Sequence, residues 1–418
     1  MIDDSANYTM RKFDNIELMP EPEDSRIPTA VDVDAPGYSG KEYGLDDSQA
    51  KQLRFIPSPI IRLLWPYGAI FFSVGVIIIL LTWNIISPLI SEVLPETEWA
   101  YDDSGIRDLQ ELGYFGSGVN VCIVDTGFDQ SHKGFSKVTL NGFRDFFYNN
   151  NDEIRDIGKD SHGTLMAGLL VANGSYIGAA PDVSLSIAIA LGPGGKSTDE
   201  SLVSQAIRWC MISQDADIIS LSLGSNPNSE FAIESETVIA VNEALDSGIF
   251  IIAAAGNTED PGENTDVSTP ASIEGVIAVG AHNKEGIVWS ESAPGSEIDP
   301  FTGDNRTFPN QKPEISAPGV YIFSTLSNTN NIPYAYSTGT SDSTVLVTGA
   351  LALILQIHGE SISGEDDTID RSEISLVKVA LANSAKNSAA NGISHNPKSG
   401  YGLLNAFEWA NQVDLEFN

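Results

Sequence analysis

Gly339-Thr340-Ser341 is a run of small residues that leads into an apolar stretch ending near Ile357. Small residues permit a sharp turn, and the apolar stretch predicts a helix, Ser343–Ile357. A serine at the start of that helix lies beside free backbone N–H groups and the positive end of the helix dipole. These groups would stabilise an oxygen that becomes negative during acyl transfer. Gly-Thr-Ser is also an ordinary way to begin a helix.

Three further polar residues stand at the end of a predicted strand or the start of a predicted helix. They are Asp125, followed by Thr-Gly, His162, followed by Gly-Thr, and Asn257, preceded by Gly. A rigidly held carboxylate can orient an imidazole, an accessible imidazole can act as a general base, and an amide can donate to an oxyanion. Taken singly, each is also unremarkable as a strand-end acid, a surface histidine or a turn asparagine.

The order Asp125, His162, Ser341 is that of the subtilisin type. With the Gly-Asn pair, these motifs mark a chain that resembles the subtilisin-like serine peptidases from about Gly113 to Trp409. Lesser marks of the resemblance are Ala180-Pro181, Ser222-Leu223-Gly224, Pro270-Ala271, Val276–Gly280, Pro313–Gly319 and Gly400–Ala406.

The resemblance implies a role for each matching residue. Ser341 is expected to be the nucleophile, His162 the general base and then acid, and Asp125 the carboxylate that orients the imidazole. Asn257 and the backbone N–H of Ser341 are expected to form an oxyanion hole.

The resemblance also implies a binding site for an extended peptide. The strand Ser222-Leu223-Gly224 would pair with the peptide backbone. The primary specificity pocket is expected to be walled by Ser222, Leu223, Gly224, Ala254, Ala255 and Gly256. These walls are small and largely apolar, which indicates an apolar or roomy pocket without a preference for basic side chains.

Apolar strands alternate with helices through this region. The predicted strands are Val119–Asp125, Val183–Ala188, Ile218–Leu223, Ile249–Ala255 and Val276–Ala281. The other predicted helices are Ile106–Leu112, His162–Ala172, Ser201–Ile212 and Glu234–Asp246. This alternation predicts an α/β fold of three layers, with a central, mostly parallel sheet covered on both faces. The candidate residues fall at the carboxyl ends of the strands, where such sheets bind ligands.

The chain departs from the family pattern in several places. Asp342 and Ser343 stand where the family usually carries Met-Ala. Asp342 either complements the helix dipole with its side chain in water, or faces the site and raises the pKa of His162. The usual second histidine is Leu165. The carboxylate of the usual calcium site would fall at Gly134, and the loop Asn173–Ile177 is short, so no metal or cofactor is predicted.

Composition bounds the class of protein. The 418 residues include 57 acidic and 22 basic ones, a net charge of −35, which excludes a nucleic-acid partner. The two cysteines, Cys122 and Cys210, lie in apolar segments and are expected to be buried free thiols rather than a bridge.

An uncharged apolar run, Leu63–Ile86, predicts one transmembrane helix within residues 59–87, with a buried core helix as the alternative. Lys51, Arg54 and Arg62 precede it, and no basic residue follows before Arg107, which favours a cytoplasmic N-terminus. Residues 1–58 are predicted to be a disordered acidic tail, residues 88–98 a stalk and residues 99–413 the peptidase domain. No pro-domain separates stalk and domain, so the fold is expected to form without one.

The sequence therefore predicts a membrane-anchored, extracytoplasmic serine endopeptidase that cleaves proteins or peptides through an acyl-enzyme. It would cross the lipid bilayer of the cell membrane once. The alternative is a catalytically inactive peptidase fold that binds peptides or protein partners, favoured by Asp342 and the missing pro-domain.

Overall fold

The computed structural model describes residues 67–86, 97–197, 199–224, 235–258, 266–328, 332–364, 368–386 and 394–417. The chain divides into two compact units, Met1–Ile90 and Ser91–Asn418. The predicted tail, residues 59–66 and 87 of the predicted membrane segment and residues 88–96 of the predicted stalk lie outside the described residues.

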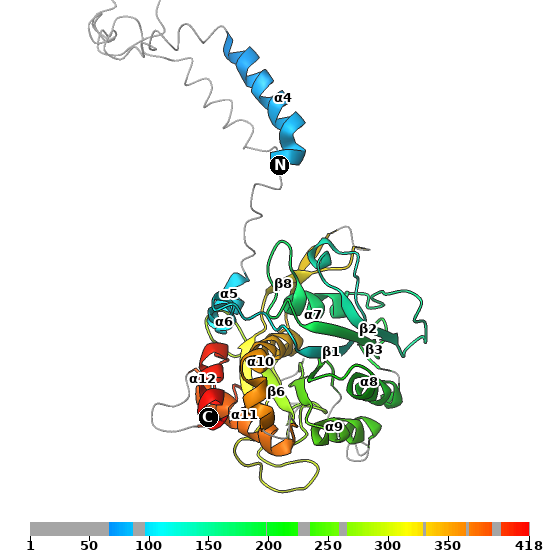
Figure 1. The fold of residues 1–418 in the computed structure, drawn as a ribbon, viewed down its shortest axis with the longest axis vertical. Helices are drawn as coiled ribbons and strands as arrows, with labels where there is room; N and C mark the ends of the chain where they lie inside the picture. The colour runs from blue at the N-terminus through cyan, green and yellow to red at the C-terminus, as the bar shows by residue number, and fades with distance from the viewer. Residues whose placement is uncertain are drawn as a thin grey trace, which may run out of the picture. The chain divides into compact units, whose positions relative to one another are not determined.

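In the first unit, α4 spans Gly68–Ile86, 19 residues without a charged side chain, and is drawn in blue in Figure 1. Large apolar side chains are exposed along it, for example Phe72 at 74% and Leu81 at 76%. Residues 68–86 of the apolar run thus form a helix. A helix that is apolar all round needs apolar surroundings on every side.

The second unit is built on a seven-stranded sheet. Its strands are β1 Asn120–Asp125, β2 Leu140–Asp145, β3 Ser184–Ile189, β4 Ile218–Leu221, β5 Phe250–Ala254, β6 Ile277–His282 and β7 Ile315–Pro318. The order is β2-β3-β1-β4-β5-β6-β7, and every neighbouring pair is parallel. The predicted parallel sheet is confirmed. All residues of β4, β5 and β6 are buried, as expected for strands covered on both faces.

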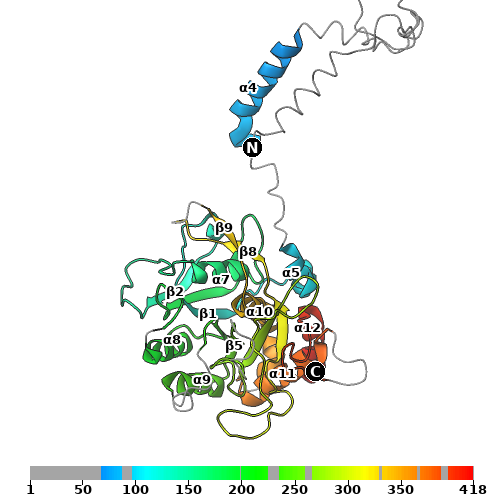
Figure 2. The same ribbon diagram turned by 180° about the vertical axis from the view of Figure 1, so that it is seen from behind.

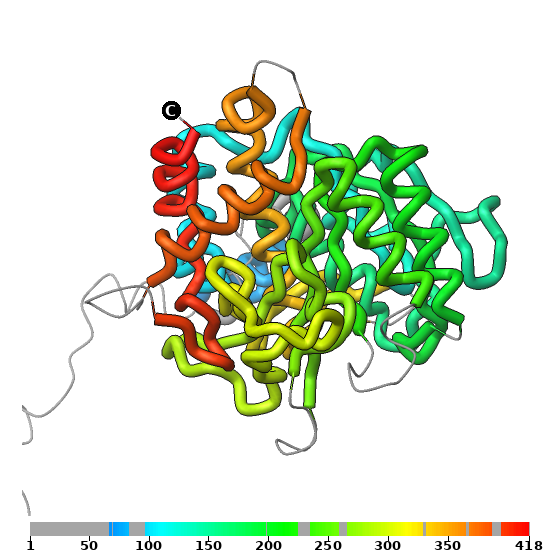
Figure 3. The backbone as a smooth tube through the Cα atoms, turned by 90° about the horizontal axis from the view of Figure 1, so that it is seen from below, coloured from blue at the N-terminus to red at the C-terminus, as the bar shows by residue number. Residues whose placement is uncertain are grey.

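Helices cover both faces of this sheet. α7 (His162–Val171) and α10 (Thr340–Ser363) lie on one face, and α8 (Glu200–Ser213) and α9 (Glu236–Asp246) on the other, as Figures 1 and 2 show from opposite sides. α12 (Ala406–Phe417) packs against both α11 (Arg371–Ser384) and α10 (Figure 3). The remaining elements are α5 Glu98–Asp103, α6 Ile106–Glu111, η2 Lys133–Phe135 and an antiparallel hairpin, β8 Ile322–Thr325 with β9 Tyr334–Ser337.

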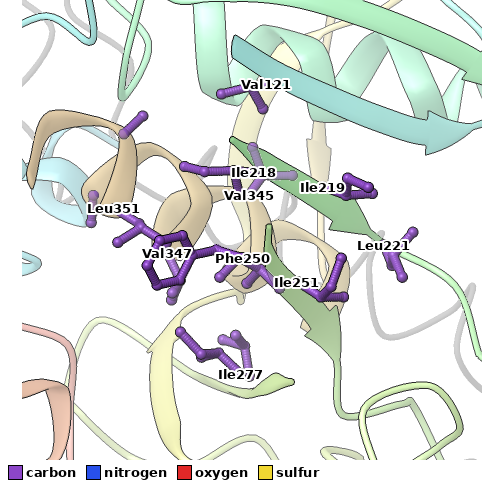
Figure 4. Close-up of a cluster of buried hydrophobic side chains, with 14 of the residues drawn as sticks. Val121, Ile218, Ile219, Leu221, Phe250, Ile251, Ile277, Val345, Val347 and Leu351 are labelled. Carbon is purple, nitrogen blue, oxygen red and sulfur yellow. The ribbon is translucent and has the colours of Figure 1, made fainter. Parts of the chain in front are cut away.

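The central helix α10 crosses the sheet and forms much of the core. Figure 4 shows side chains of α10, among them Val345 and Leu351, gathered with Ile218 of β4 and Phe250 of β5. All four are at most 1% exposed. Burying each such side chain contributes roughly 1.5–3 kcal/mol, so α10 anchors the domain and fixes its own first turn, which carries Ser341.

Close packing explains why a glycine, Gly349, stands within α10. A Cβ at this position would lie 2.3 Å from the Cβ of Ala179, so only glycine allows this close approach. Among helices in the described residues, α10 alone has the length and apolarity of a membrane span. Of its most apolar stretch, 67% is buried inside the protein, as expected for a core helix. The described apolar part of α4, Ile70–Thr82, is shorter.

The expectation of two free thiols is wrong. Cys122 and Cys210 form a disulfide, with their Cα atoms 5.8 Å apart. Cys122 lies in the middle of β1 and Cys210 in α8, which packs on β1. Both segments are apolar because both are buried, and the fold brings the two residues within bridging distance. Apolar surroundings alone could not reveal that pairing.

Candidate active site

The carboxyl ends of β1, β4 and β5 and the first turns of α7 and α10 meet at one edge of the sheet. A cleft of about 350 Å³ opens there. Ser341, His162 and Asn257, which are far apart in the sequence, all line it. Asp125 lies directly behind His162, fully buried at the last position of β1. The fold therefore brings the four predicted polar residues together.

The carboxylate of Asp125 holds the imidazole of His162. Its two oxygens lie 2.8 and 3.0 Å from Nδ1 of the ring, and Oδ1 also accepts the N–H of Thr126 at 2.7 Å. Before His162, Ser161 has a left-handed backbone with φ of 54°, which turns the chain sharply into α7. The ring is thus fixed with Nδ1 toward the acid, which leaves Nε2 for a proton of the nucleophile.

Asp156, which sequence reasoning missed, connects the residue after Asp125 with the start of α7 through hydrogen bonds. Its Oδ1 accepts bonds from the hydroxyl of Thr126 and the N–H of Gly158, both at 2.8 Å. Its Oδ2 accepts the N–H and hydroxyl of Thr164 at 2.8 and 2.6 Å. The Thr126 hydroxyl in turn accepts the N–H of Gly163. One carboxylate thereby joins the residue after Asp125 to the first turn of α7. Nothing in the local sequence around Asp156 signals this non-local role.

Nearby carboxylates change the pKa of the His162 imidazole. Burial opposes protonation of His162, but Asp125, through its charge and its hydrogen bond, and the charges of Asp342 and Asp156 outweigh burial. Together they raise the pKa of His162 to about 9. A raised pKa favours the imidazolium, so the fraction of neutral His162 that could accept a proton grows as the pH rises.

The side-chain oxygen of Asn257 is held by Thr340. This oxygen, Oδ1, accepts the backbone N–H of Thr340 at 3.1 Å and the Thr340 hydroxyl at 2.9 Å, so the NH₂ group of Asn257 points elsewhere. A Cβ on Gly339 would lie 3.2 Å from Nδ2 of Asn257 and 3.7 Å from the backbone N of Ser341. Gly339 thus lies beside both expected donors, and a side chain at this position would crowd the amide of Asn257.

Five of the six predicted wall residues line the cleft: Ser222, Leu223, Gly224, Ala254 and Gly256. The sixth, Ala255, is fully buried in the hydrophobic core and does not line it. The reason is alternation, since successive side chains of an extended segment point to opposite sides.

Ser268 was not foreseen as a site residue, yet it lies between the two walls. A Cβ on Gly224 would lie 2.6 Å from Cβ of Ser268, and one on Gly256 would lie 2.2 Å from its Oγ. Ser268 lines the same cleft and its N–H donates to the carbonyl of Ala255. The sequence offered no signal for it, because the residue reaches the wall from a separate loop.

The residues around the usual calcium position do not fit a calcium ion. Gly134 brings no carboxylate, and the side-chain oxygen of Asn173 accepts a bond from the ammonium of Lys137 at 3.2 Å. A cation would compete with that ammonium. Across the described part of the chain, no group of three or more His, Cys, Asp or Glu is gathered as a metal site.

Comparison with known proteins agrees with this geometry. The chain is 36% identical to subtilisin E of Bacillus subtilis (strain 168) over 253 residues, 60% of this chain and 58% of that protein. It is 35% identical to a subtilisin of Bacillus pumilus over 253 residues, 60% of this chain and 81% of that protein. The major intracellular serine protease of B. subtilis is 34% identical over 255 residues, 60% of this chain and 72% of that protein.

This chain thus spans a little over half the length of subtilisin E. The family model described as "Subtilase family" matches residues 116–402, which is more than half of the chain and includes Asp125, His162, Asn257 and Ser341. The chain therefore belongs to the subtilase family.

Proposed function

We propose that this protein is a serine endopeptidase that hydrolyses peptide bonds through an acyl-enzyme. The observation that carries the proposal is the convergence of Asp125–His162, Ser341 and Asn257 on one cleft. A metal ion is not needed for such chemistry, because the imidazole supplies the base and the amide and backbone supply the oxyanion donors.

The residues divide the reaction between them. Nε2 of His162 takes the proton of the Ser341 hydroxyl as Oγ attacks the peptide carbonyl carbon. The negative oxygen that forms is stabilised by Nδ2 of Asn257 and the N–H of Ser341. His162 then gives its proton to the leaving amine as the C–N bond breaks. Water, with His162 again as base, hydrolyses the ester and restores Ser341.

The substrate is an extended peptide with a small residue before the scissile bond. The sequence indicated an apolar or roomy pocket, whereas the position of Ser268 favours a smaller one. Ser222, Leu223 and Gly224 continue the chain beyond β4, where a peptide backbone can pair with them. Ser268 narrows the space between the walls formed by Gly224 and Gly256. A small side chain such as that of alanine fits beside this hydroxyl better than an aromatic ring.

The test is hydrolysis of an unfolded protein and of a chromogenic peptide with alanine before the scissile bond, using the full chain in detergent. Ser341→Ala and His162→Ala should each abolish turnover while both variants still melt cooperatively. An inactive binding module, the alternative, would bind the peptide with the same affinity in wild type and Ser341→Ala and cleave it in neither.

We further propose that the protein is anchored in the cell membrane by α4, with its catalytic domain outside. The 19 residues of α4 make a helix about 28 Å long, close to the 30 Å of a bilayer's hydrocarbon core. Arg54 and Arg62 before it favour a cytoplasmic N-terminus. The Cys122–Cys210 disulfide supports an oxidising compartment for the catalytic domain.

Protease added to sealed cells tests this topology. It should remove an epitope placed after Asn418 and spare one placed before Met1. Loss of the epitope before Met1 in sealed cells would reverse the orientation, and recovery of the full chain in the soluble fraction would remove the anchor.

A further inference from the structure

Asp342 is a buried acid directly after the nucleophile. It is the third residue of α10 and is 1% exposed. Its Oδ2 accepts the hydroxyl of Ser337 at 2.9 Å, and its Oδ1 is buried without a hydrogen-bond partner. Of the two alternatives left open by the sequence, a side chain pointing into water is therefore excluded.

The missing partner bears on the charge state of Asp342. A buried carboxylate with one oxygen unpaired is disfavoured relative to its neutral form. Burial accordingly raises the pKa of Asp342 to about 7, although the Ser337 hydrogen bond and the charge of His162 both oppose the rise. The side chain thus changes charge near neutral pH, far above the range of an exposed aspartate.

Two titratable groups interact electrostatically with this carboxyl among the residues that the structure describes. They are His162 from α7 and Tyr101 from α5. Burial, with a smaller contribution from Asp342, keeps the pKa of Tyr101 well above its usual range, so the phenol stays neutral. His162 itself also faces Asp125 and Asp156, which are present whatever the state of Asp342. Ionisation of Asp342 is therefore an added charge felt by the base.

The same carboxyl lies near the oxyanion hole. The point where a Cβ on Gly339 would lie is 3.2 Å from Nδ2 of Asn257 and 3.7 Å from Oδ2 of Asp342. Asp342 and Asn257 thus both lie beside Gly339, and a negative charge in this neighbourhood disfavours the negative oxygen of the tetrahedral intermediate. In the neutral form Asp342 has no such effect.

We propose that Asp342 is a positioning residue whose ionisation shifts the activity of this site to alkaline pH. It acts through His162, which it stabilises as the imidazolium, and it weakens the oxyanion hole by its charge. Protons leave the pair in two steps as pH rises, the first mainly from Asp342 and the second from His162. The enzyme becomes active only with the second step. The kinetic part of this inference rests on the proposed peptidase function.

The first experiment compares the pH dependence of kcat/KM for wild type and Asp342→Asn, as full chains in detergent. The acid limb should move to lower pH by about one unit, the lower end of the effect of one nearby charge. At a fixed pH that lies below the acid limbs of both profiles, kcat/KM of the variant should be about tenfold higher than that of wild type. Because Asp342 is buried, the shift should change little between 0.1 and 1 M salt.

A matched control is Glu360→Gln. Glu360 is an exposed acid on the same helix, 18 residues further on and therefore about 27 Å away along the axis. This variant loses the same charge and should keep the wild-type profile. Superimposable profiles for wild type and Asp342→Asn would overturn the proposal, and an equal shift in Glu360→Gln would assign the effect to net charge.

A second measurement does not need turnover. NMR of the full chain labelled with [¹³C]histidine follows each ring directly, and the His162 signal is assigned by its loss in His162→Ala. The pKa of His162 should fall by about one unit in Asp342→Asn. An unchanged value would overturn the proposal even if the variant were inactive. If wild type neither hydrolyses peptides nor reacts with a serine-directed inhibitor, the proposed function fails, while this titration still tests the electrostatic inference.

Discussion

The side-chain oxygen of Asn257 is held by Thr340 through two hydrogen bonds, at 3.1 Å to its backbone N–H and at 2.9 Å to its hydroxyl. The Thr340 hydroxyl also accepts the N–H of Gly256 at 3.2 Å. Thr340 thus fixes both the side chain of Asn257, the proposed oxyanion donor, and the backbone of Gly256, which lines the cleft. This links the first turn of α10 to the end of β5.

Removing the Thr340 hydroxyl should therefore lower turnover. We expect Thr340→Val to reduce kcat by roughly tenfold, the value of about one hydrogen bond, with little change in KM. Asn257→Ala should cost more, about 10²–10³-fold, because the donor itself is lost. Thr340→Ser keeps the hydroxyl and should retain most of the activity. Equal kcat values for Thr340→Val and wild type would show that the backbone bond alone orients the amide.

Much of this fold follows from the sequence. The five predicted strands match β1, β3, β4, β5 and β6 within one or two residues, because apolar residues dominate each of them. β2 and β7 were not predicted. β2 is an edge strand with mixed exposure, and β7 is four residues long and ends in proline, so neither carries a periodic pattern. α10 extends to Ser363 rather than Ile357, since its last turns are polar.

The residues of the site also divide into those that could be predicted from the sequence and those that could not. Asp125, His162, Asn257 and Ser341 could be predicted because each stands in a short motif at a strand end or helix start. Asp156 and Ser268 could not, because their partners are brought near by the fold. The pairing of Cys122 with Cys210 was missed for the same reason. The direction of the Asp342 side chain also depends on tertiary packing, which one sequence does not contain.

Ser268 should limit the size of the residue before the scissile bond. The quantity of interest is the ratio of kcat/KM for a peptide with phenylalanine before the scissile bond to kcat/KM for one with alanine. We expect Ser268→Gly to raise this ratio by at least about tenfold, the scale of one or two buried methylenes. Ser268→Thr should act in the opposite direction. The measurement is kcat/KM for paired chromogenic peptides. An unchanged ratio in both variants would place Ser268 outside the pocket that selects the substrate.

The disulfide should stabilise the catalytic domain. It joins residues 88 positions apart, and loop entropy in the unfolded chain gives an upper value of about 4–5 kcal/mol. We expect Cys122→Ala combined with Cys210→Ala to lower Tm by about 10 °C. Both side chains are buried and small, so little packing is lost. Wild type treated with a reductant is the control, and an unchanged Tm in both would show that no bridge forms.

The acidic surface should make stability depend on salt. With a net charge of −35, like charges repel one another in the folded protein. Salt screens this repulsion, since the Debye length falls from about 10 Å at 0.1 M to about 3 Å at 1 M. Tm should therefore rise with sodium chloride over this range. A flat or falling Tm would mean that local ion pairs, such as Arg306 with Asp266, outweigh the repulsion.

The central claim is that Ser341 is a nucleophile activated by His162. Fluorophosphonate labelling of the full chain, followed by mass spectrometry of the adduct, tests it most directly. The account predicts one adduct per chain, on Ser341, formed faster as pH rises toward 9 and lost in both Ser341→Ala and His162→Ala. Equal labelling of wild type and Ser341→Ala, or no labelling of folded wild type at any pH, would contradict it.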